Sequence, residues 1–327
     1  LDAATMGDTP LDCIAELGEL ICWQTSTREE ALERVSDCEV LIINKVIVDR
    51  ELIDAAPSLK LICEAATGVN NIDLEYAASK GIPVRNVAAY STDSVVQQTF
   101  MHLFSLMGNG PYFDARVKDG TYSAMPIFTD VSMPFVEAAG KTIGIVGMGA
   151  IGSKVAAAAE VFGMKVVYYS TSGTSHCTRY PSLPLDELLA VSDVISIHAP
   201  MNEHTRGMIG AEELAMMKPT AFLLNLGRGG IVDEPALAEA VDRGVIAGAA
   251  LDVFCREPLP SDNPLLHVSH PERFRFTPHT AWASVEARQR LAEGIAAPEV
   301  SEKSSVERCR IRSRSALRKN PDLPRKV

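Results

Sequence analysis

The amino-acid sequence predicts an α/β protein in which parallel sheets carry helices on both faces, and three observations lead to this class. Short apolar runs alternate with helix-forming segments along most of the chain, as in parallel sheets joined by helical crossovers. A glycine-rich turn joins one apolar run to a helix near mid-chain, and three later runs each end in a polar side chain. A length of 327 residues favours two domains over one.

The first ninety residues contain alternating strand and helix segments. Thr27 and Asp73 stand just before two of the expected helices, and both residue types favour the N-cap position. The chain opens with what looks like the end of a strand. The expected strands are 1–3, 20–24, 40–44, 59–64 and 82–85, and the expected helices are 10–19, 28–35, 49–56 and 74–80.

A polar loop with a glycine, residues 65–73 (AATGVNNID), follows the strand at 59–64. Ligands bind at the carboxyl ends of strands in open α/β sheets. We therefore expect Thr67 and Gly68 to present backbone N–H groups to a ligand. A simple turn with Asp73 capping the next helix is the alternative, and both can hold together.

The rest of the chain continues the same alternation after one long helix. That helix is expected at 94–107, is interrupted at 109–111, and precedes an irregular segment at 112–134. Aromatic residues spread along this segment favour packing on another subunit or across a domain cleft. Further strands are expected at 143–146, 165–169, 194–197, 221–226, 247–253 and 275–277, and further helices at 153–162, 182–190, 211–217 and 234–243.

Residues 143–152 (IGIVGMGAIG) combine a buried strand with a glycine-rich turn, and a helix-forming segment follows. The pattern G-x-G-x-x-G marks a dinucleotide site when a strand precedes it and a helix follows it. We expect Gly147 to form the tight turn, Gly149 to let the backbone approach a pyrophosphate, and Gly152 to let helix and strand pack closely. A glycine turn without a ligand is the competing interpretation, and the context favours the nucleotide.

The end of the next strand bears on the choice of cofactor. Ser170 stands near the position where a carboxylate would hold the adenosine ribose of NAD. No carboxylate occurs between Lys165 and Arg179. The choice between NAD and NADP therefore stays open at this point.

Three later strands each deliver a polar residue just past their carboxyl end: Arg228, Glu257 and His279. A guanidinium suits the carboxylate of a 2-keto acid because its planar fork binds both oxygens. A histidine can give a proton near neutral pH, and a carboxylate beside it would favour the protonated ring. Each residue alone is as easily a cap, a loop or a surface turn. Together, downstream of a dinucleotide pattern, they predict a site that reduces a keto acid.

Composition excludes several other classes of protein. The net charge of −11 implies no general affinity for nucleic acid. No run of 18 apolar residues is present, so no membrane span is expected, and no signal peptide is visible. Seven scattered cysteines without C-x-x-C spacing indicate reduced thiols in a cytoplasmic compartment. We expect no metal site.

Five segments give the chain a resemblance to the D-isomer-specific, NAD(P)-dependent 2-hydroxyacid dehydrogenase family. The match runs from about residue 1 to 297, and the loops at 66–68 and 90–93 look most like the glycerate dehydrogenase, or hydroxypyruvate reductase, branch. The segments are 147–152, 192–200 (SDVISIHAP), 225–233 (NLGRGGIVD), 250–258 (ALDVFCREP) and 277–284 (TPHTAWAS).

The resemblance implies two doubly wound parallel-sheet domains, with a Rossmann cofactor domain inserted into a flavodoxin-like substrate domain. On this basis we expect the substrate domain at 1–94, the NAD(P)-binding domain at 95–283, and a return helix of the substrate domain at 284–298. A homodimer built on the cofactor domains is also implied.

The resemblance further implies roles for individual residues. Arg228 would bind the substrate carboxylate and carbonyl, Glu257 would pair with the general acid/base His279, and Trp282 would border the substrate. Thr67 and Gly68 would hold the carboxylate through backbone N–H groups. The implied cofactor contacts are Gly147, Gly149, Ala150, Ile151 and Gly152 at the pyrophosphate, Ser170 at the ribose, Ala199, Pro200, Leu226 and Gly227 along the cofactor, and Asp252 at the nicotinamide carboxamide.

Two features depart from the family pattern. Ser170 replaces the usual acidic residue. Residues 299–327 do not match the family and hold nine Lys/Arg against four Asp/Glu, the composition of a disordered basic tail. An aberrant terminus is favoured over a nucleic-acid-binding arm.

The leading hypothesis is reduction of hydroxypyruvate or glyoxylate by NAD(P)H, giving D-glycerate or glycolate. A relative of formate dehydrogenase is a second enzyme class, but that branch pairs its histidine with Gln rather than Glu. A corepressor-like protein of the same fold that senses NAD(H) is the alternative outside catalysis, and the residues alone do not exclude it.

Overall fold

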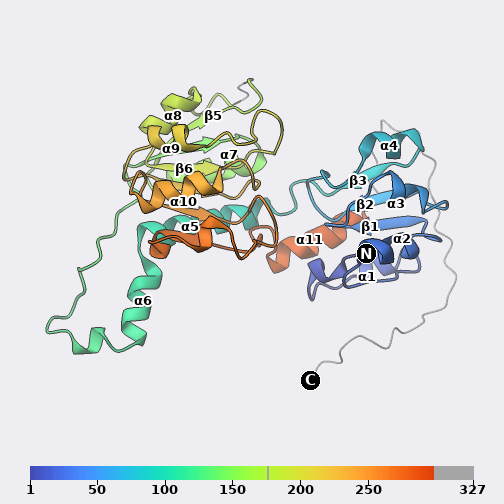
Figure 1. Cartoon of the computed structure of the whole chain (residues 1–327), viewed down its shortest axis with the longest axis horizontal. Helices are drawn as coiled ribbons and strands as arrows, with labels where there is room; N and C mark the ends of the chain where they lie inside the picture. The colour runs from blue at the N-terminus through green and yellow to red at the C-terminus, as the bar shows by residue number, and fades with distance from the viewer. Residues whose placement is uncertain (175–176, 298–327) are drawn as a thin grey trace. The chain divides into compact units, whose positions relative to one another are not determined.

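The computed structural model describes residues 1–174 and 177–297. The chain forms two compact units (Figure 1). The first comprises Leu1–Ser91 and the segment that begins at Val285, and the second is Thr92–Ser284. Residues 299–327, expected as a disordered tail, lie outside the described residues.

The first unit is built on a three-stranded parallel sheet in the order β1-β2-β3. Its strands are β1 (Val40–Ile43), β2 (Leu61–Glu64) and β3 (Val84–Asn86). Apolar side chains of these strands and of three helices form a single core cluster. The helices and 3-10 turn of this unit are η1 (Ala3–Met6), α1 (Asp12–Ala15), α2 (Arg28–Arg34), α3 (Arg50–Asp54), α4 (Leu74–Ser79) and α11 (Val285–Ala296).

The start of the chain departs from the expected pattern. Residues 3–6 form a 3-10 turn, the segment 20–24 is not a strand, and the helix expected at 10–19 shortens to α1. The amides of Ala3 and Ala4 donate to the carbonyl groups of Trp23 and Gln24, so the two segments pair loosely with each other outside the sheet. Gly18 disfavours a longer helix because its backbone loses more entropy on ordering.

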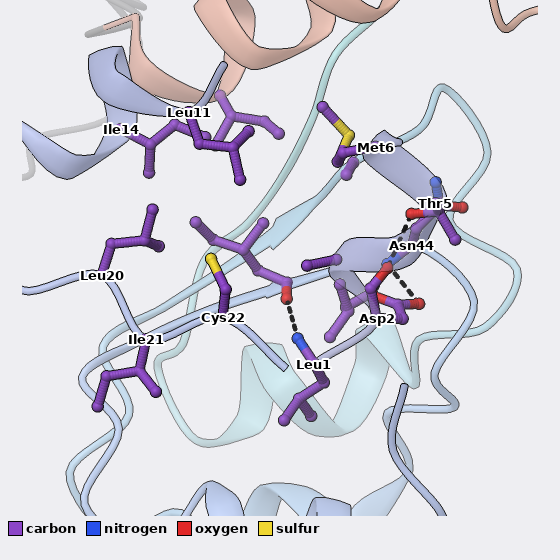
Figure 2. Close-up of a pocket in the computed structure, with 15 residues that line it drawn as sticks. Leu1, Asp2, Thr5, Met6, Leu11, Ile14, Leu20, Ile21, Cys22 and Asn44 are labelled. Carbon is purple, nitrogen blue, oxygen red and sulfur yellow. Dashed lines mark hydrogen bonds between the residues drawn. The ribbon is translucent and has the colours of Figure 1, made fainter. Parts of the chain in front are cut away.

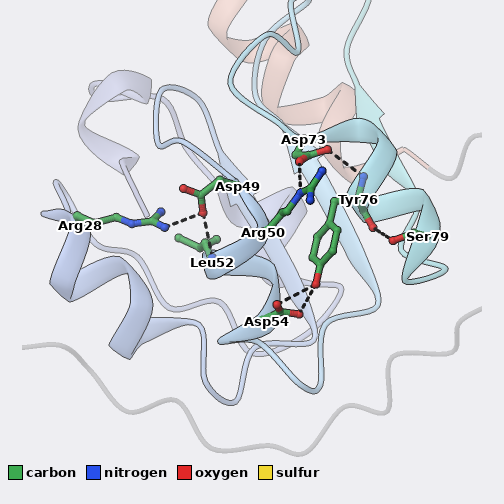
Figure 3. Close-up of polar contacts among 8 residues, drawn as sticks. All are labelled: Arg28, Asp49, Arg50, Leu52, Asp54, Asp73, Tyr76 and Ser79. Carbon is green, nitrogen blue, oxygen red and sulfur yellow. Dashed lines mark hydrogen bonds and ion pairs between the residues drawn. The ribbon is translucent and has the colours of Figure 1, made fainter.

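Side-chain caps explain where the helices of this unit begin. Thr27 and Glu30 form a reciprocal capping box at α2, with N···O distances of 3.2 and 2.8 Å. Figure 3 shows Asp49 and Asp73 at the starts of α3 and α4, where they accept from the amides of Leu52 at 3.1 Å and Tyr76 at 2.9 Å. These caps confirm the helix starts expected from the sequence.

The second unit is built on a six-stranded, wholly parallel sheet in the order β5-β4-β6-β7-β8-β9. Side chains of α5 and α7 form the core on one face, and those of α8, α9 and α10 form the core on the other. The elements are β4 (Thr142–Val146), β5 (Lys165–Tyr169), β6 (Val194–Ile197), β7 (Phe222–Asn225), β8 (Gly248–Leu251), β9 (Phe274–Phe276), α5 (Thr92–Met107), α7 (Ala150–Val161), α8 (Leu185–Val191), α9 (Ala211–Met216) and α10 (Glu234–Asp242). The predicted α/β class is confirmed.

The segment expected to be irregular at 112–134 contains a further helix, α6 (Gly110–Lys118), and a 3-10 turn, η2 (Tyr122–Ala124). Asn109 in the left-handed conformation separates α5 from α6, and Pro111 occupies the first turn, where its missing N–H costs nothing. Figure 1 shows α6 and the chain after it projecting from the rest of this unit. Two short 3-10 turns, η3 (Pro264–Leu266) and η4 (Pro271–Arg273), complete the unit.

Within the described part of the chain, no helix has the length and apolar character needed to cross a membrane.

Glu64, the last residue of β2, is a buried carboxyl group in the first unit. Its side chain is inaccessible to solvent, and one oxygen accepts from the Asn71 amide at 3.1 Å. The other oxygen, Oε1, has no hydrogen-bond partner among the described residues. Burial raises the pKa of Glu64 to about 8, so the folded protein keeps this group protonated at neutral pH.

This burial predicts that the first unit loses stability as the pH rises. Unfolded Glu64 ionises near pH 4.5, whereas the folded group ionises near 8, so the unfolded state binds fewer protons between these values and becomes favoured. We expect Glu64→Gln to remove this loss. At about 1.36 kcal/mol per pKa unit, the gain over the parent at pH 9 is at most ~5 kcal/mol.

The measurement is urea unfolding at pH 5, 7 and 9 in a Trp282→Phe background, where Trp23 is the one tryptophan left in the chain. Exposed Glu75→Gln is the matched control and should keep the pH dependence of the parent. Equal pH dependence in the parent and Glu64→Gln would contradict the prediction.

Candidate active site

The strand order of the second unit predicts a ligand site at the carboxyl edge of its sheet. Strand β4 pairs with β5 on one side and with β6 on the other, so the chain reverses its progress across the sheet between β5 and β6. Such a switch point opens a crevice at the carboxyl ends of the strands that flank it. The glycine turn follows β4, and Ala199 and Pro200 follow β6.

The three glycines of the turn have different structural surroundings. Gly147 has φ of +93°, in the region that favours glycine. A Cβ on Gly152 would lie 2.1 Å from the Gly147 carbonyl oxygen, so only glycine lets α7 approach β4 this closely. Gly149 is the N-cap of α7 and has open space at its Cβ position. Ala150 and Ile151 follow in the first turn of α7, whose free N–H groups attract an anion.

The loop after β6 contacts this turn through backbone atoms, and the loop after β7 in turn contacts the loop after β6. A Cβ on Gly147 would meet the His198 carbonyl oxygen at 3.0 Å, and one on Gly227 would meet the Ala199 carbonyl oxygen at 2.9 Å. Leu226 and Ala199 are buried, whereas Pro200 is exposed. The structure therefore brings together the predicted cofactor residues on β4, β6 and β7 along one edge.

Ser170 directly follows β5 and lies in a turn rich in hydroxyl groups. Its Oγ donates to the Thr174 carbonyl at 2.7 Å and lies 3.3 Å from Ser172 Oγ. Arg179, the nearest downstream cation, forms an ion pair with Glu160 and stacks on Tyr180. This turn thus carries neither a carboxylate nor an uncommitted guanidinium.

Arg228 lies between glycines in the loop that follows β7. Asn225 fixes this loop: its Oδ1 accepts from the Gly227 amide at 3.1 Å, and its Nδ2 donates to the Arg228 carbonyl at 2.9 Å. One guanidinium nitrogen of Arg228 donates to the Gly227 carbonyl at 2.8 Å. Across residues 1–174 and 177–297, no carboxylate pairs with Arg228, so its other donors can bind an anionic ligand.

Glu257 and His279 are in direct contact. Glu257 Oε2 lies 2.6 Å from His279 Nδ1, and Oε1 accepts from the Phe254 amide at 3.0 Å. A carboxylate only accepts hydrogen bonds, so Nδ1 carries the proton and Nε2 is the atom that can exchange one with a ligand. The side chains are about one quarter exposed, at 23% for His279 and 29% for Glu257.

Asp252, expected at the nicotinamide carboxamide, already holds the loop that carries His279. Its buried carboxylate accepts from the Thr277 hydroxyl at 2.6 Å and from the amides of Thr280 and Ala281 at 2.8 and 2.9 Å. Burial raises the pKa of Asp252, and these donors oppose the rise. The sequence did not reveal this second role.

The remaining predicted substrate residues belong to separate parts of the chain. Trp282 is half-buried, three residues beyond His279 in the second unit. Thr67 and Gly68 lie in the first unit, in the loop after β2. The Thr67 hydroxyl donates to the Val87 carbonyl at 3.1 Å, and the Asn86 amide donates to the Thr67 carbonyl at 2.6 Å. These bonds anchor the loop from the end of β3.

Several residues that shape the site were not found from the sequence. Asn225 occurs in a quoted motif without a predicted role, and Asp252 was predicted at the nicotinamide carboxamide but not as the residue that holds the His279 loop. Glu234 accepts from the Cys255 amide at 2.6 Å and from Asn263 at 2.7 Å, which holds the loop before Glu257. His102 contacts Thr277 from helix α5. A polar residue on an apolar helix or strand was the available signal, but its partner depends on the fold.

A cavity of about 60 Å³ lies elsewhere, in the first unit beside the start of the chain (Figure 2). Apolar side chains line most of it, the backbone nitrogen of Leu1 donates to the Ile42 carbonyl at 3.0 Å, and Asp2 accepts from the Asn44 backbone amide at 3.0 Å. No predicted catalytic or cofactor residue lines this cavity.

The geometry of the second unit agrees with comparison to known proteins. Residues 100–281 match the family model described as D-isomer specific 2-hydroxyacid dehydrogenase, NAD binding domain. The chain belongs to this family. The resemblance inferred from the sequence motifs is confirmed, and so is the Rossmann character of the larger sheet.

Individual relatives are similar over most of their length. A glyoxylate reductase of Korarchaeum cryptofilum is 38% identical, over 88% of this chain and 87% of the relative. A glycerate dehydrogenase of Methylorubrum extorquens is 38% identical, over 83% of this chain and 84% of the relative. The solved structure of a D-lactate dehydrogenase from Aquifex aeolicus with NAD and lactic acid has a TM-score of 0.76 and 30% identity, covering 87% and 88% of the two chains.

The shape of the glycine turn is compatible with a bound dinucleotide. Gly149 leaves room beside the amides of α7, and Gly147 and Gly152 bring the turn close to β4 and β6. A pyrophosphate bound there would accept from the first amides of α7.

The open space at Gly149 and the tight contact at Gly152 predict opposite effects of the same substitution. We expect Gly152→Ala to destabilise the protein by about 1–3 kcal/mol, since backbone must move to admit the new Cβ. Gly149→Ala should leave stability near that of the parent and weaken dinucleotide binding, because the methyl group occupies the ligand side. Thermal unfolding without cofactor and NADH fluorescence titration measure the two effects. Tight NADH binding by Gly149→Ala would contradict a pyrophosphate at this turn.

Proposed function

We propose that the protein transfers hydride between NAD(P)H and a short 2-keto acid, with hydroxypyruvate or glyoxylate as substrate and D-glycerate or glycolate as product. The observation that carries this proposal is the 2.6 Å contact of Glu257 with His279, on the same sheet edge as Arg228 and the glycine turn. The names of the glyoxylate reductase and glycerate dehydrogenase relatives support the substrate class.

The proposed chemistry divides between the cofactor and three side chains. The bound nicotinamide supplies the hydride to C2 of the substrate. Arg228 binds the substrate carboxylate and stabilises charge that develops on the carbonyl oxygen. His279 gives a proton to that oxygen from Nε2, and Glu257 stabilises the protonated ring and fixes its orientation. The product is the 2-hydroxy acid.

We assign the other predicted residues to binding. The second unit is the cofactor domain, with Ser170 at the ribose, Ala199, Pro200, Leu226 and Gly227 along the cofactor, and Asp252 near the carboxamide. The first unit is the substrate domain, in which the amides of Thr67 and Gly68 face the substrate carboxylate. Trp282 borders the substrate.

A panel of 2-keto acids with NADH and with NADPH, followed by absorbance loss, tests the proposed activity. We expect hydroxypyruvate or glyoxylate to give the highest kcat/KM. Tight NADH binding without turnover of any keto acid would contradict the enzyme and favour a nucleotide-sensing role. Formate oxidation would contradict the keto-acid assignment, and the Glu257 contact argues against that branch.

We also propose that the protein is a cytoplasmic homodimer. The segment after α6 exposes large apolar side chains, including Phe128 at 88% and Phe135 at 65% of their surface, which a second subunit would cover. No disulfide joins any two of the six described cysteines, which fits a reducing compartment. Light scattering after size exclusion tests the dimer, and a monomer at micromolar concentration would contradict it.

The proposed role of His279 predicts that its loss slows the chemical step and leaves cofactor binding unchanged. His279→Ala should lower kcat by roughly 10²–10⁴-fold, the usual contribution of a general acid, while NADH binds as in the parent. His267→Ala, an exposed histidine outside the site, should behave as the parent. Near-parental kcat in His279→Ala would assign the proton to another group.

The turn at Ser170 predicts relaxed choice between the two cofactors. Its hydroxyl groups do not repel the 2′-phosphate of NADP, and Arg179 is engaged by Glu160 instead of attracting it. We expect a modest preference for NADH, and Ser170→Asp should sharpen it by repelling NADPH. The measurement is kcat/KM for each cofactor. A parent ratio beyond about a hundredfold, or ~2.7 kcal/mol, would contradict relaxed choice.

A further inference from the structure

A buried histidine outside the proposed catalytic set lies directly behind the loop of His279. His102, in the middle of α5, is 1% exposed, and its Nε2 lies 2.9 Å from the Thr277 hydroxyl. Its Nδ1 has no hydrogen-bond partner among the described residues. Burial, with a smaller contribution from Arg275, lowers the pKa of His102 to about 4. A neutral, half-satisfied imidazole costs free energy that an apolar side chain at this position would avoid.

The direction of the hydrogen bonds follows from the groups involved. The Thr277 hydroxyl lies 2.6 Å from Asp252 Oδ1, which also accepts from the Thr280 amide. A hydroxyl has one proton, so Thr277 donates to the carboxylate and accepts from His102. His102 is therefore the Nε2–H tautomer. The imidazole, hydroxyl and carboxylate form a one-way chain of donors from α5 to the sheet edge.

This chain of hydrogen bonds ends at the backbone segment that carries His279. Asp252 accepts from the amides of Thr280 and Ala281, and its own carbonyl accepts from the His279 amide at 2.8 Å. His279 has φ of +55°, a conformation that side-chain-bearing residues rarely adopt. Such a conformation persists only where surrounding contacts hold it. Ser94, also on α5, adds a second bond by donating to the Ala281 carbonyl at 2.6 Å.

We propose that His102 is a positioning residue for His279. By donating to Thr277, it holds that hydroxyl toward Asp252, and Asp252 fixes the backbone from which the His279 ring projects toward Glu257. This inference rests on the proposed function for its kinetic readout, but the geometry of the His279 ring tests it independently of turnover.

The charged groups around this chain of hydrogen bonds predict what the loss of His102 would change. His279 faces Glu257 on the loop after β8 and interacts electrostatically with Asp252 at the end of β8. His102 faces Thr277 and Arg275, whose guanidinium is held by Ser105 at 2.8 Å. Because His102 stays neutral at working pH, it orients the Thr277 hydroxyl and adds no charge to the site. Removal of the His102 donor lets the Thr277 hydroxyl turn away from Asp252, so the loop that holds the His279 ring against Glu257 should loosen.

The variants are His102→Leu, which removes the donor at similar volume, and Thr277→Val, which breaks the chain at its centre. Thr277→Ser keeps the hydroxyl and should restore the parental behaviour. Thr99→Val is the matched control, because Thr99 is a buried residue of the same helix whose hydroxyl donates to the Val95 carbonyl of that helix.

For His102→Leu and Thr277→Val we expect NADH affinity within about twofold of the parent and kcat lower by about tenfold, as for small displacements of a catalytic group. Reduction needs a protonated His279, so the alkaline fall of kcat/KM should move to lower pH by about half a unit or more. NMR of chains labelled at the histidine rings, with the His279 signal identified by its loss in His279→Gln, should give the same shift.

Two outcomes would overturn the proposal. One is a loss of thermal stability in both variants with parental pH profiles and parental titration of the His279 ring, which would make His102 a packing residue. The other is an equal shift in Thr99→Val. If the parent reduces no keto acid, the proposed function fails, and the NMR titration alone still decides whether His102 positions His279.

Discussion

The loops that follow β4, β6, β7 and β8 touch one another through backbone atoms, and the catalytic arrangement depends on this contact. Glycine makes each contact possible: a Cβ on Gly147 or Gly227 would press on Ala199, and one on Gly229 would lie 1.8 Å from the Phe254 carbonyl oxygen. Since the strands are parallel, their carboxyl ends meet at one edge, and the glycines let the loops there close into a continuous rim. Any side chain at these positions would force neighbouring loops apart.

The rim determines where the polar side chains lie. Arg228 stands between Gly227 and Gly229, so both of its neighbours are held against other loops, and Asn225 closes the turn from within. Glycine loses more conformational entropy on folding than other residues, and the left-handed His279 adds further cost. The hydrogen bonds of Asn225 and Asp252 and the apolar cores on the two faces of the sheet offset this cost.

The sequence predicted the features that depend on local pattern. Buried strands such as β4 and β7, the N-caps at Thr27 and Asp73, and the glycine turn follow from apolar runs, capping residues and spacing. The strands expected at 1–3 and 20–24 were wrong, because an apolar run forms a strand only with a partner in a sheet. Helix α6 was missed since its nine residues contain no buried side chain and so no apolar periodicity.

The site shows the same division between local and long-range information. Arg228, Glu257 and His279 could be proposed because each follows a strand, and the contact between the last two was expected. The functions of Asn225, Asp252 and His102 could not, since their partners lie on other strands or on α5. His102 and Thr277 are 175 residues apart in the chain, a pairing that no spacing rule supplies.

Two carboxylates near His279 illustrate how surroundings assign different roles to one functional group. Asp252 is 1% exposed, and its side chain accepts three hydrogen bonds, from one hydroxyl and two backbone amides that keep their protons. Glu257 is 29% exposed on its side chain and contacts the imidazole directly. In the proposed reduction His279 gives up its proton, which leaves Glu257 without its cation, and water can solvate that carboxylate at little cost. A carboxylate as buried as Asp252 would make the same step expensive. The solvated Glu257 therefore suits the position beside the imidazole, and the buried Asp252 suits the position that holds the backbone.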